Sequence, residues 1–406
     1  MNQPSVDFSQ LPIAIVYDQA TTAHGGAELV LRQLKQLFPN ATLFTTVHNA
    51  TAAAWTNNWT IKTSGLQTLY RLLPKHEWLT PFMPLAIENL STQLTEHRVI
   101  ISVSAGAAKG VITRPEQLHL CYLLTPTRYL YIESDQYLNA YGAHTLARGL
   151  GIAQPLLRYL RRWDIIAAQR PDKIITISNL VSQRTQNIYR RSADALIYPP
   201  IPETVSAQQE PLPIENYNLC ISRLVWYKRV DLAIKASLVR RETLCIAGEG
   251  SHEKQLSSIA QDKAYRRNPS ESIAQAMKNM TKQNKLICFL GSVTAVEKST
   301  LFAHAKSLIM PGLEDFGLTA IEAAQQGVPS LIRQGSGVSE VLLQKTHAQH
   351  IQTDTTSAVA QALEEISQHP PSKKQLTQLA KDYTAQAFRI QFQKTVSNFW
   401  TTHHSV

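Results

Sequence analysis

Two glutamates in the segment EDFGLTAIE have a spacing that would let their carboxylates reach different parts of one ligand. Glu314 and Glu322 are separated by seven residues, and Gly317 lies where a loop would turn into the helix LTAIEAAQQG. We expect Glu314 in the loop and Glu322 in the second helical turn, so that one carboxylate reaches a sugar hydroxyl and the other a ribose diol. The helix N-terminus, at Phe316, Gly317 and Leu318, offers unpaired N–H groups to a diphosphate. The plainer alternative is a turn carboxylate and a solvent-facing helix residue.

Two cations occur earlier in the same half of the chain. Arg223 and Lys228 belong to SRLVWYKRVDLAIKA, where an apolar run gives way to a helical pattern. An arginine can bind phosphate through a bidentate fork and a lysine as a point charge. Placed in a strand-to-helix loop, the two side chains can neutralise a departing diphosphate. A pair of ordinary surface cations is the alternative.

A glycine pair follows the first apolar run of the chain. Gly25 and Gly26 in HGGAELVL allow the backbone to approach a phosphate or an acceptor closely, with Glu28 in the helix behind them. A Gly-Gly pair is weak evidence alone. All three segments, however, would lie at the carboxyl ends of parallel strands, where α/β sheets bind ligands.

The elements that must position these residues repeat one pattern twice. Short β-branched apolar runs alternate with helix-length segments, which is typical of parallel sheets with helical crossovers. The runs are 13–17, 41–47, 99–104, 118–124 and 173–178, then 218–222, 243–247, 286–290, 307–310 and 328–332. We predict an α/β chain with a Rossmann-like domain at 1–198, a Pro-rich linker at 199–215, a second such domain at 216–384, and a C-terminal helix at 385–406.

We assign no chemistry to three further segments. The C-terminal helix presents an apolar stripe, which predicts packing back toward the N-terminal domain through Phe388, Phe392, Val396 and Phe399. The polar segment 251–285 is expected to form helices or a mobile excursion. The GEG at 248–250 lacks the third glycine of a dinucleotide fingerprint, which argues against a dehydrogenase.

Composition limits the classes of function. The 406 residues include four cysteines in apolar runs, and the N-terminus has neither a signal-peptide pattern nor a membrane-span-length apolar stretch. We therefore expect a cytoplasmic protein with reduced cysteines. The net charge of +10 suits phosphorylated ligands or anionic lipid. Nucleic acid is disfavoured because zinc-ligand and RNA-binding signatures are missing, whereas RYLRRW at 158–163 mixes cations and aromatics as interfacial segments do.

These motifs together resemble the retaining glycosyltransferases of family 4, which have the GT-B fold. The resemblance covers nearly the whole chain. It is carried by SRLVWYKRVDLAIKA, AGEG, FLGSV and PGLEDFGLTAIEAAQQGVPS in the second half and by PFMPLAIENL, AAKGVITRPEQLHLCYLLTPTRY and RRWDIIAAQRPDKIITISN in the first. The first-half segments are similar to bacterial mannosyltransferases of polysaccharide and O-antigen assembly.

The resemblance implies two Rossmann-like domains facing each other across a cleft and a nucleoside diphosphate α-sugar donor, GDP-mannose by likeness. It implies that Glu322 holds the donor ribose, Glu314 lies by the transferred sugar, and Arg223 with Lys228 stabilises the leaving diphosphate. Transfer would proceed with retention, without a metal or other cofactor, to a glycan or polyprenyl-linked acceptor at the inner face of the membrane. The acceptor-side residues it implies are Lys109, Thr125 and Arg128.

The chain departs from the family pattern on the sugar-contacting side. Leu124 and Ala105 stand where histidines are usual, Ser336 where a glycine is usual, and Pro202 where an aspartate is common. Two alternatives to an active transferase therefore stay open. One is a catalytically impaired nucleotide-sugar-binding protein that acts as a partner subunit, and the other is a phosphorylase or epimerase of the same fold.

Overall fold

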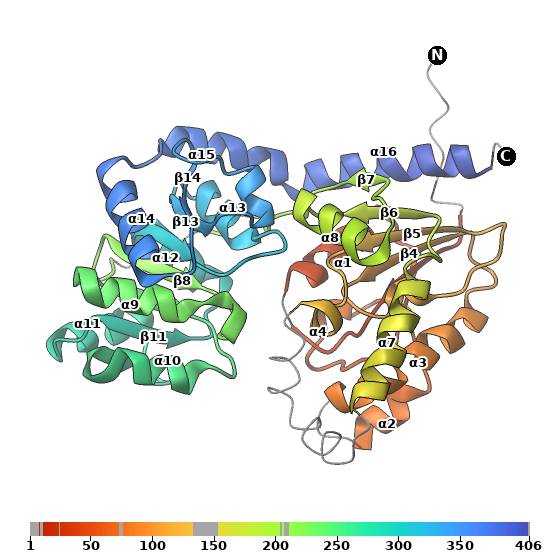
Figure 1. The fold of residues 1–406 in the computed structure, drawn as a ribbon, viewed down its shortest axis with the longest axis horizontal. Helices are drawn as coiled ribbons and strands as arrows, with labels where there is room; N and C mark the ends of the chain where they lie inside the picture. The colour runs from red at the N-terminus through yellow and green to blue at the C-terminus, as the bar shows by residue number, and fades with distance from the viewer. Residues whose placement is uncertain are drawn as a thin grey trace. The chain divides into compact units, whose positions relative to one another are not determined.

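The computed structural model divides the chain into two compact units. Unit 1 comprises Met1–Pro199 with Gln386–Val406, and unit 2 comprises Pro200–Ala385. The structure describes residue 8 and residues 11–23, 25–72, 76–132, 153–203, 205–206 and 211–404, the side chains of 76–78 and 153 excepted. In the described residues each unit contains one seven-stranded sheet, and every strand pairing is parallel (Figure 1). The predicted α/β class is confirmed.

The sheet of unit 1 has the strand order β3-β2-β1-β4-β5-β6-β7. Its central strands are buried along their whole length, as parallel strands covered on both faces require. The strands are β1 (Ile13–Tyr17), β2 (Thr42–Thr45), β3 (Ile61–Thr63), β4 (Val99–Ser104), β5 (Leu118–Leu123), β6 (Lys173–Thr176) and β7 (Ala195–Leu196). The strand order reverses between β1 and β4, so the loops that follow these two strands diverge there.

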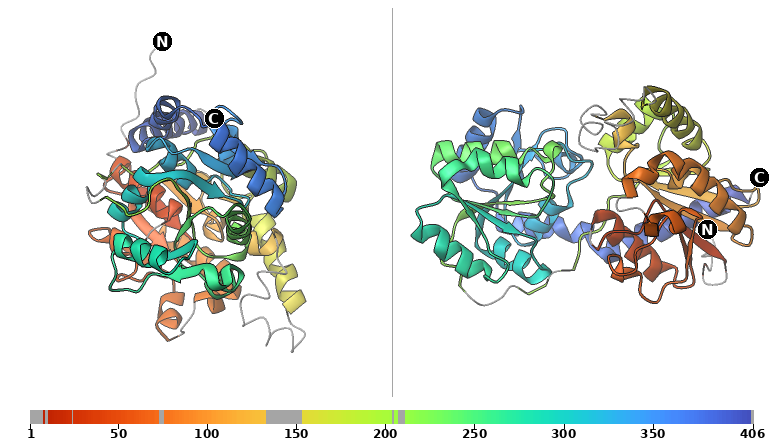
Figure 2. Two further views of the ribbon diagram at one scale, coloured as in Figure 1. Left: turned by 90° about the vertical axis from the view of Figure 1, so that its left-hand side faces the viewer. Right: turned by 90° about the horizontal axis from the view of Figure 1, so that it is seen from below.

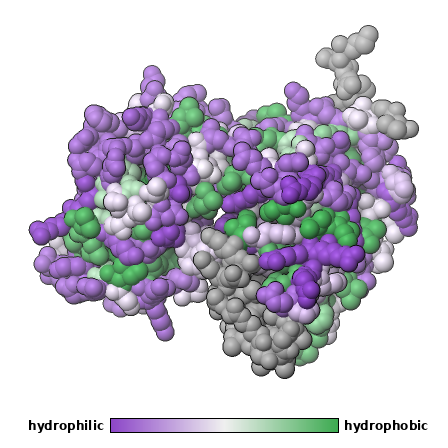
Figure 3. All heavy atoms as spheres, viewed as in Figure 1, coloured by the Kyte–Doolittle hydropathy of each residue, from purple (hydrophilic) through white to green (hydrophobic). Residues whose placement is uncertain are grey.

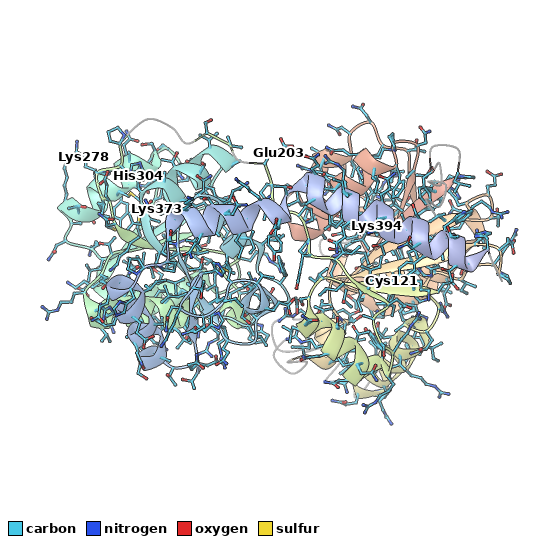
Figure 4. All side chains as sticks on the ribbon, turned by 90° about the horizontal axis from the view of Figure 1, so that it is seen from above. Cys121, Glu203, Lys278, His304, Lys373 and Lys394 are labelled. Carbon is cyan, nitrogen blue, oxygen red and sulfur yellow. The ribbon has the colours of Figure 1, made fainter. Side chains whose placement is uncertain are left out.

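Helices cover the sheet of unit 1. They are α1 (Gly26–Leu37), α2 (Leu66–Leu72), α3 (Met83–Leu90), α4 (Arg128–Tyr131), α7 (Ala153–Ala167), α8 (Asn179–Tyr189) and α16 (Ala385–His403). The C-terminal helix α16, which carries the labelled Lys394, lies across the strands of unit 1 (Figure 4). Its Phe388 and Phe392 are buried edge-on to the Tyr122 ring of β5, with ring centroids 5.9 and 6.0 Å away.

The sheet of unit 2 has the order β10-β11-β9-β8-β12-β13-β14 and reverses between β8 and β12. Its strands are β8 (Tyr217–Ile221), β9 (Leu244–Ala247), β10 (Ala264–Arg266), β11 (Ile287–Gly291), β12 (Ala305–Met310), β13 (Ser330–Arg333) and β14 (Ala348–Ile351). Helices lie on both faces of the sheet (Figure 2). They are α9 (Val230–Arg240), α10 (Glu253–Ala260), α11 (Ile273–Lys282), α12 (Ala295–His304), α13 (Leu318–Gln325), α14 (Thr356–Gln368) and α15 (Lys373–Ala380).

Local signals in the sequence explain where several of these helices begin. Both α11 and α12 start with a capping box, in which Ser272 with Gln275 and Thr294 with Glu297 satisfy the first N–H groups reciprocally. Helix α13 begins at Gly317, whose φ of 113° falls in the left-handed region that favours glycine. The loop therefore turns into the helix at the predicted residue.

Two predicted segments have a more definite structure than the sequence indicated. Residues 251–285 form α10, β10 and α11, so they belong to the sheet and its covering helices. The proposed linker 199–215 is tied to unit 2, because Ile201 N donates to Tyr383 O (2.8 Å) and Ser299 Oγ donates to Val205 O (2.7 Å).

Candidate functional site

Lys228 and Glu314 meet at the reversal point of the unit 2 sheet. Lys228 ends the short 3-10 helix η5 (Trp226–Lys228) after β8, and Glu314 lies in the loop after the neighbouring strand β12. The Lys228 ammonium contacts both carboxylate oxygens of Glu314, with a distance of 2.5 Å from Nζ to Oε2. Their side chains are 16% and 14% exposed. The sequence predicted both residues, and the structure places them in direct contact.

A glycine allows this contact. Gly312 passes so close to η5 that a Cβ built on it would lie 2.7 Å from the Lys228 Cα and would also strike the Tyr227 carbonyl oxygen. Because those neighbours are backbone atoms, a side chain here would force the two loops apart. Gly312 therefore sets the approach of the Glu314 loop to Lys228.

Ser336 stabilises the backbone of the same loop. Its buried hydroxyl accepts a hydrogen bond from Glu314 N (3.1 Å), and Gly337 N donates to Glu314 O (3.0 Å). Val338 N donates to Phe316 O (2.6 Å). The serine that departs from the family pattern thus positions Glu314 through its hydroxyl.

Arg223 lies at the exposed rim of this site. Its Nη2 donates to the Tyr227 hydroxyl (2.8 Å), and the Lys228 ammonium lies 5.4 Å from the centre of the Tyr227 ring. Tyr227 thus contacts both predicted phosphate-binding cations. The arrangement provides two positive groups on one loop at the carboxyl end of β8, as the sequence predicted.

Glu322 lies in the second turn of α13 and is 9% exposed, so it is not a solvent-facing residue. Its carboxylate forms an ion pair with Lys298 of the adjacent helix α12. The pairing offsets the cost of burying the carboxylate. Phe316 is buried, and Gly317 with Leu318 begins the helix, so the N-terminal N–H groups of α13 follow directly after the Glu314 loop.

The GEG segment fills a structural place beside the site. A Cβ on Gly248, whose φ is 127°, would strike Ser222 O, and one on Gly250 would lie 2.6 Å from the Leu224 carbonyl carbon. These glycines let the loop after β9 pack against the loop after β8. Their close packing explains GEG without a dinucleotide.

In unit 1, Gly25 and Gly26 are exposed at the start of α1, after β1. Gly25 has extended backbone, and a Cβ on it would strike the Glu28 carboxylate. Glu28 is buried and accepts hydrogen bonds from the Tyr17 hydroxyl (2.8 Å) and the Thr22 hydroxyl (2.7 Å). Gly25 therefore gives Glu28 room to fold back on the loop.

Asp18 holds together the loops at the reversal point of the unit 1 sheet. Its carboxylate, at the end of β1, accepts from Ala105 N (2.7 Å) and Ala108 N (2.6 Å) after β4. Burial raises the pKa of Asp18, against the opposing effect of these hydrogen bonds. Leu124 N donates to Ser104 O (2.9 Å), so Ala105 and Leu124 follow the ends of adjacent strands.

Lys109, one of the predicted acceptor-side residues, lies in a buried network of unit 1. It is 1% exposed, and its ammonium donates to Asp164 Oδ1 (2.5 Å), Thr127 Oγ1 (3.1 Å) and Gly106 O (2.5 Å). Burial alone would lower the pKa of Lys109, but the Asp164 carboxylate outweighs it and raises the pKa. All three ammonium donors are used inside unit 1, so Lys109 holds these loops together, and its acceptor-side role stays a prediction.

The other predicted acceptor-side residues flank this network. Thr125 is buried between β5 and α4, and Arg128 is the half-buried first residue of α4.

Within the described ranges, no cluster of three or more His, Cys, Asp or Glu side chains is placed to hold a metal ion. Over the same residues, no helix combines the length and apolarity needed to cross a membrane.

Several residues of the site were missed from the sequence. Asp18, Tyr227, Lys298 and Gly312 each act through a partner on another segment. Tyr227 and Gly312 could have been noticed, because they adjoin Lys228 and Pro311 in predicted loops. Nothing local marks Lys298 as the partner of Glu322.

Comparison with known proteins finds a family model that matches most of unit 2. Residues 203–383 match the family model described as glycosyl transferases group 1. None of the curated proteins matches the chain. Among solved structures, HepE from Anabaena in complex with UDP has 14% sequence identity and a TM-score of 0.66, covering 96% of this chain and 100% of that chain.

Two further structures agree with that result. Sucrose-phosphate synthase from Thermosynechococcus elongatus has 12% identity and a TM-score of 0.65, covering 97% of this chain and 100% of that one. The lipopolysaccharide outer core galactosyltransferase WaaB has 14% identity and a TM-score of 0.62, covering 95% and 99%. At such identities these matches establish the fold, and they confirm the predicted GT-B architecture with two Rossmann-like domains.

Proposed function

We propose that this chain, whose residues 203–383 match the group 1 glycosyl transferase model, is a glycosyltransferase that transfers a hexose with retention from a nucleoside diphosphate α-sugar. The observation that carries the proposal is the cluster of Arg223, Lys228 and Glu314 at the reversal point of the unit 2 sheet. Ligands of open α/β sheets bind at such points. A diphosphate there would meet two cations and the N-terminus of α13.

The residues divide the donor between them. Arg223 and Lys228 neutralise the diphosphate as it leaves, and Glu314, held against Lys228, accepts from a hydroxyl of the transferred sugar. Glu322 accepts from the ribose. Anabaena HepE was solved with UDP and with UDP-glucose, which supports a nucleoside diphosphate sugar as the donor class. Mannose from GDP-mannose is the donor that the sequence resemblance favours.

The proposed step needs charge stabilisation rather than a protein nucleophile. The bond from the sugar C1 to the diphosphate oxygen breaks, and the acceptor hydroxyl oxygen bonds to C1 on the same face. The acceptor proton passes to the departing diphosphate oxygen. Fixed positive groups stabilise the charge that develops on that oxygen, a contribution of about 3–4 kcal/mol for one well-placed donor.

The acceptor is a glycan or a lipid-linked glycan, as in cell-surface polysaccharide synthesis at the inner face of the membrane. Helices α3 and α7 of unit 1 are in contact, because Trp163 Nε1 donates to Glu88 Oε1 (2.8 Å). We propose that the two helices together form the face that meets the lipid surface. In Figure 3 apolar and polar residues interleave on the side of unit 1 that carries these helices. Exposed apolar side chains on α3 and α7 are Leu85, Tyr159, Ile165 and Ile166.

Exposed arginines among these apolar side chains suit an anionic membrane. Arg158 and Arg162 lie on α7 and are exposed. Sedimentation with vesicles that contain anionic lipid should fall in the double variant Arg158→Glu/Arg162→Glu and not in Arg241→Glu, an exposed control in unit 2. Equal binding of the wild type, the double variant and Arg241→Glu to the vesicles would contradict the proposed membrane contact.

A turnover assay tests the function. The protein is incubated with GDP-mannose or UDP-glucose and glycan acceptors, and nucleoside diphosphate release and the anomeric configuration of the product are measured. Release that depends on acceptor, with an α-linked product, supports retaining transfer. A β-linked product contradicts retention. Donor binding without release under any condition would favour the catalytically impaired protein, which the apolar Ala105 and Leu124 at the strand ends of unit 1 would suit.

A further inference from the structure

We propose that Lys298 is a positioning residue that orients the Glu322 carboxylate for recognition of the donor ribose. This inference rests on the proposed function, because it assumes a nucleoside diphosphate in unit 2. It adds a residue that belongs to none of the motifs in the sequence. The starting observation is the ion pair between Lys298 Nζ and Glu322 Oε2.

The pair joins two helices that start near the same edge of the sheet. Lys298 lies one turn into α12, which follows β11, and Glu322 lies in the second turn of α13, which follows β12. Both helices run away from the carboxyl ends of their strands, where the donor is expected. The side chain of Lys298 is 29% exposed and that of Glu322 is 11% exposed. The Glu322 carboxylate is thus nearly buried, whereas the Lys298 side chain is partly exposed.

The backbone on both sides of Lys298 is fixed. Glu297 Oε2 accepts from Thr294 N (2.8 Å) in the capping box, and Glu297 Oε1 accepts from Arg267 Nη2 (2.7 Å). On the other side Ser299 Oγ donates to Val205 O (2.7 Å). These contacts hold the start of α12, so the Lys298 side chain reaches Glu322 from a fixed backbone position.

The orientation of the Glu322 carboxylate matters because it must accept hydrogen bonds from a diol. Two adjacent hydroxyls need two correctly placed lone pairs, whereas a carboxylate that rotates freely presents them in many orientations. An ionised carboxylate has about four acceptor positions on its two oxygens. Lys298 contacts one oxygen and leaves acceptor positions for the diol. If Lys298 were removed, the nearly buried Glu322 carboxylate would also lose this cation, which would cost folding free energy.

The experiment measures discrimination between riboses rather than affinity alone. UDP, GDP and their 2′-deoxy forms are titrated by calorimetry into the wild-type chain and into Lys298→Met, Lys298→Arg and Lys306→Met. Lys306 is a matched control, because it forms an ion pair with Glu242 at 3.6 Å in the same unit and its side chain is 30% exposed. Melting temperatures confirm that each variant is folded.

We expect the wild type to bind the ribonucleotide about tenfold more tightly than the deoxynucleotide, as a hydrogen bond to a charged group provides. Lys298→Met should reduce this ratio to about twofold or less, Lys298→Arg should restore most of it, and Lys306→Met should keep it. A Lys298→Met variant with the wild-type ratio overturns the inference. An equal loss of affinity for both nucleotides also overturns it, because Lys298 would then contact the phosphates directly. If the wild type binds no nucleoside diphosphate, the proposed function fails instead.

Discussion

At the scale of single residues, the contact of Lys228 with both oxygens of Glu314 makes the donor site a charge-balanced unit before any ligand binds. A diphosphate must share Lys228 with Glu314, and Arg223 at the rim supplies the additional positive charge. In the proposed function, Lys228 both binds the phosphate and fixes the Glu314 carboxylate beside the sugar. This double role makes the site sensitive to small changes at Lys228.

Removal of either cation should affect the chemical step. We expect Arg223→Ala and Lys228→Ala each to lower transfer by about two to three orders of magnitude, because each removes a fixed charge that stabilises the leaving diphosphate. Steady-state kinetics with the best donor measure this effect. Arg241→Ala, at an exposed arginine at the C-terminal end of α9, is the control. Full turnover of a folded Arg223 or Lys228 variant would refute the phosphate assignment.

A buried histidine predicts a pH dependence of stability. Burial, with the nearby Arg191 and Arg170, lowers the pKa of His119 to about 3, and its Nε2 lies 2.9 Å from Ser102 Oγ. The folded chain keeps His119 neutral, whereas the unfolded chain takes up a proton below about pH 6.5. Stability from this group is present above pH 6.5 and is lost progressively as pH falls toward 3.

The measurement is the denaturant midpoint at pH 7 and pH 5. The denaturant midpoint of the wild type should be lower at pH 5 than at pH 7. The difference between the two midpoints should be smaller in His119→Gln. A variant with the same pH dependence as the wild type would mean that His119 does not contribute.

The sequence predicted the donor-site residues better than the acceptor-side ones. Arg223, Lys228 and Glu314 lie in loops that directly follow predicted strands, so their position at one sheet edge follows from strand order. Lys109 also follows a strand, but its direction depends on Asp164, which is 55 residues later on α7. No local pattern reveals that partner, so its burial was not foreseen.

At the scale of elements, the predicted strands were those with continuous apolar runs. Strands such as β4, with the sequence VIISVS, are buried throughout and have neighbours on both sides. The four strands that the prediction omitted are the edges of the two sheets: β3 (IKT), β7 (AL), β10 (AYR) and β14 (AQHI). An edge strand pairs on one side only and is short and partly polar, so it lacks the apolar run.

The close approach of two loops in unit 2 predicts the effect of a small substitution. In Gly312→Ala the new Cβ meets backbone atoms of Tyr227 and Lys228, so η5 must shift relative to the Glu314 loop. A displacement of about 1 Å in a catalytic group costs about 100-fold in rate. We therefore expect transfer to fall about 100-fold in Gly312→Ala.

Gly65→Ala is the control for this substitution, because a Cβ there meets nothing within 4 Å. Its kinetics should match the wild type. A Gly312→Ala variant with wild-type kinetics would show that the two loops tolerate separation.

The C-terminal helix contributes to the stability of unit 1 through one face. Phe392 is fully buried against Tyr122 and Phe388, whereas Ile390 on the same helix is 61% exposed. Phe392→Ala should lower the free energy of unfolding by about 3–5 kcal/mol, because it leaves a cavity in a packed core. Urea unfolding measures this loss. Ile390→Ala should change it by less than about 0.5 kcal/mol, and an equal effect of the two substitutions would contradict the docking of α16 through its aromatic stripe.

At the scale of the whole molecule, the chain is basic, with a net charge of +10. Both proposed ligands, a nucleoside diphosphate and an anionic membrane, are negatively charged. Part of the basic character lies in the donor site of unit 2 and part on α7 of unit 1. The two contributions can be tested separately, because Arg223 and Lys228 belong to one unit and Arg158 and Arg162 to the other.

The central claim is that unit 2 binds a nucleoside diphosphate through Arg223 and Lys228. Calorimetric titration of the full chain with UDP and GDP, and with their sugars, tests it most directly when repeated on Lys228→Ala and on the control Lys306→Met. The account predicts saturable binding of one base to the wild type and the control, and at least about tenfold weaker binding to Lys228→Ala. Absence of binding by every nucleotide, or equal binding by Lys228→Ala, would contradict it.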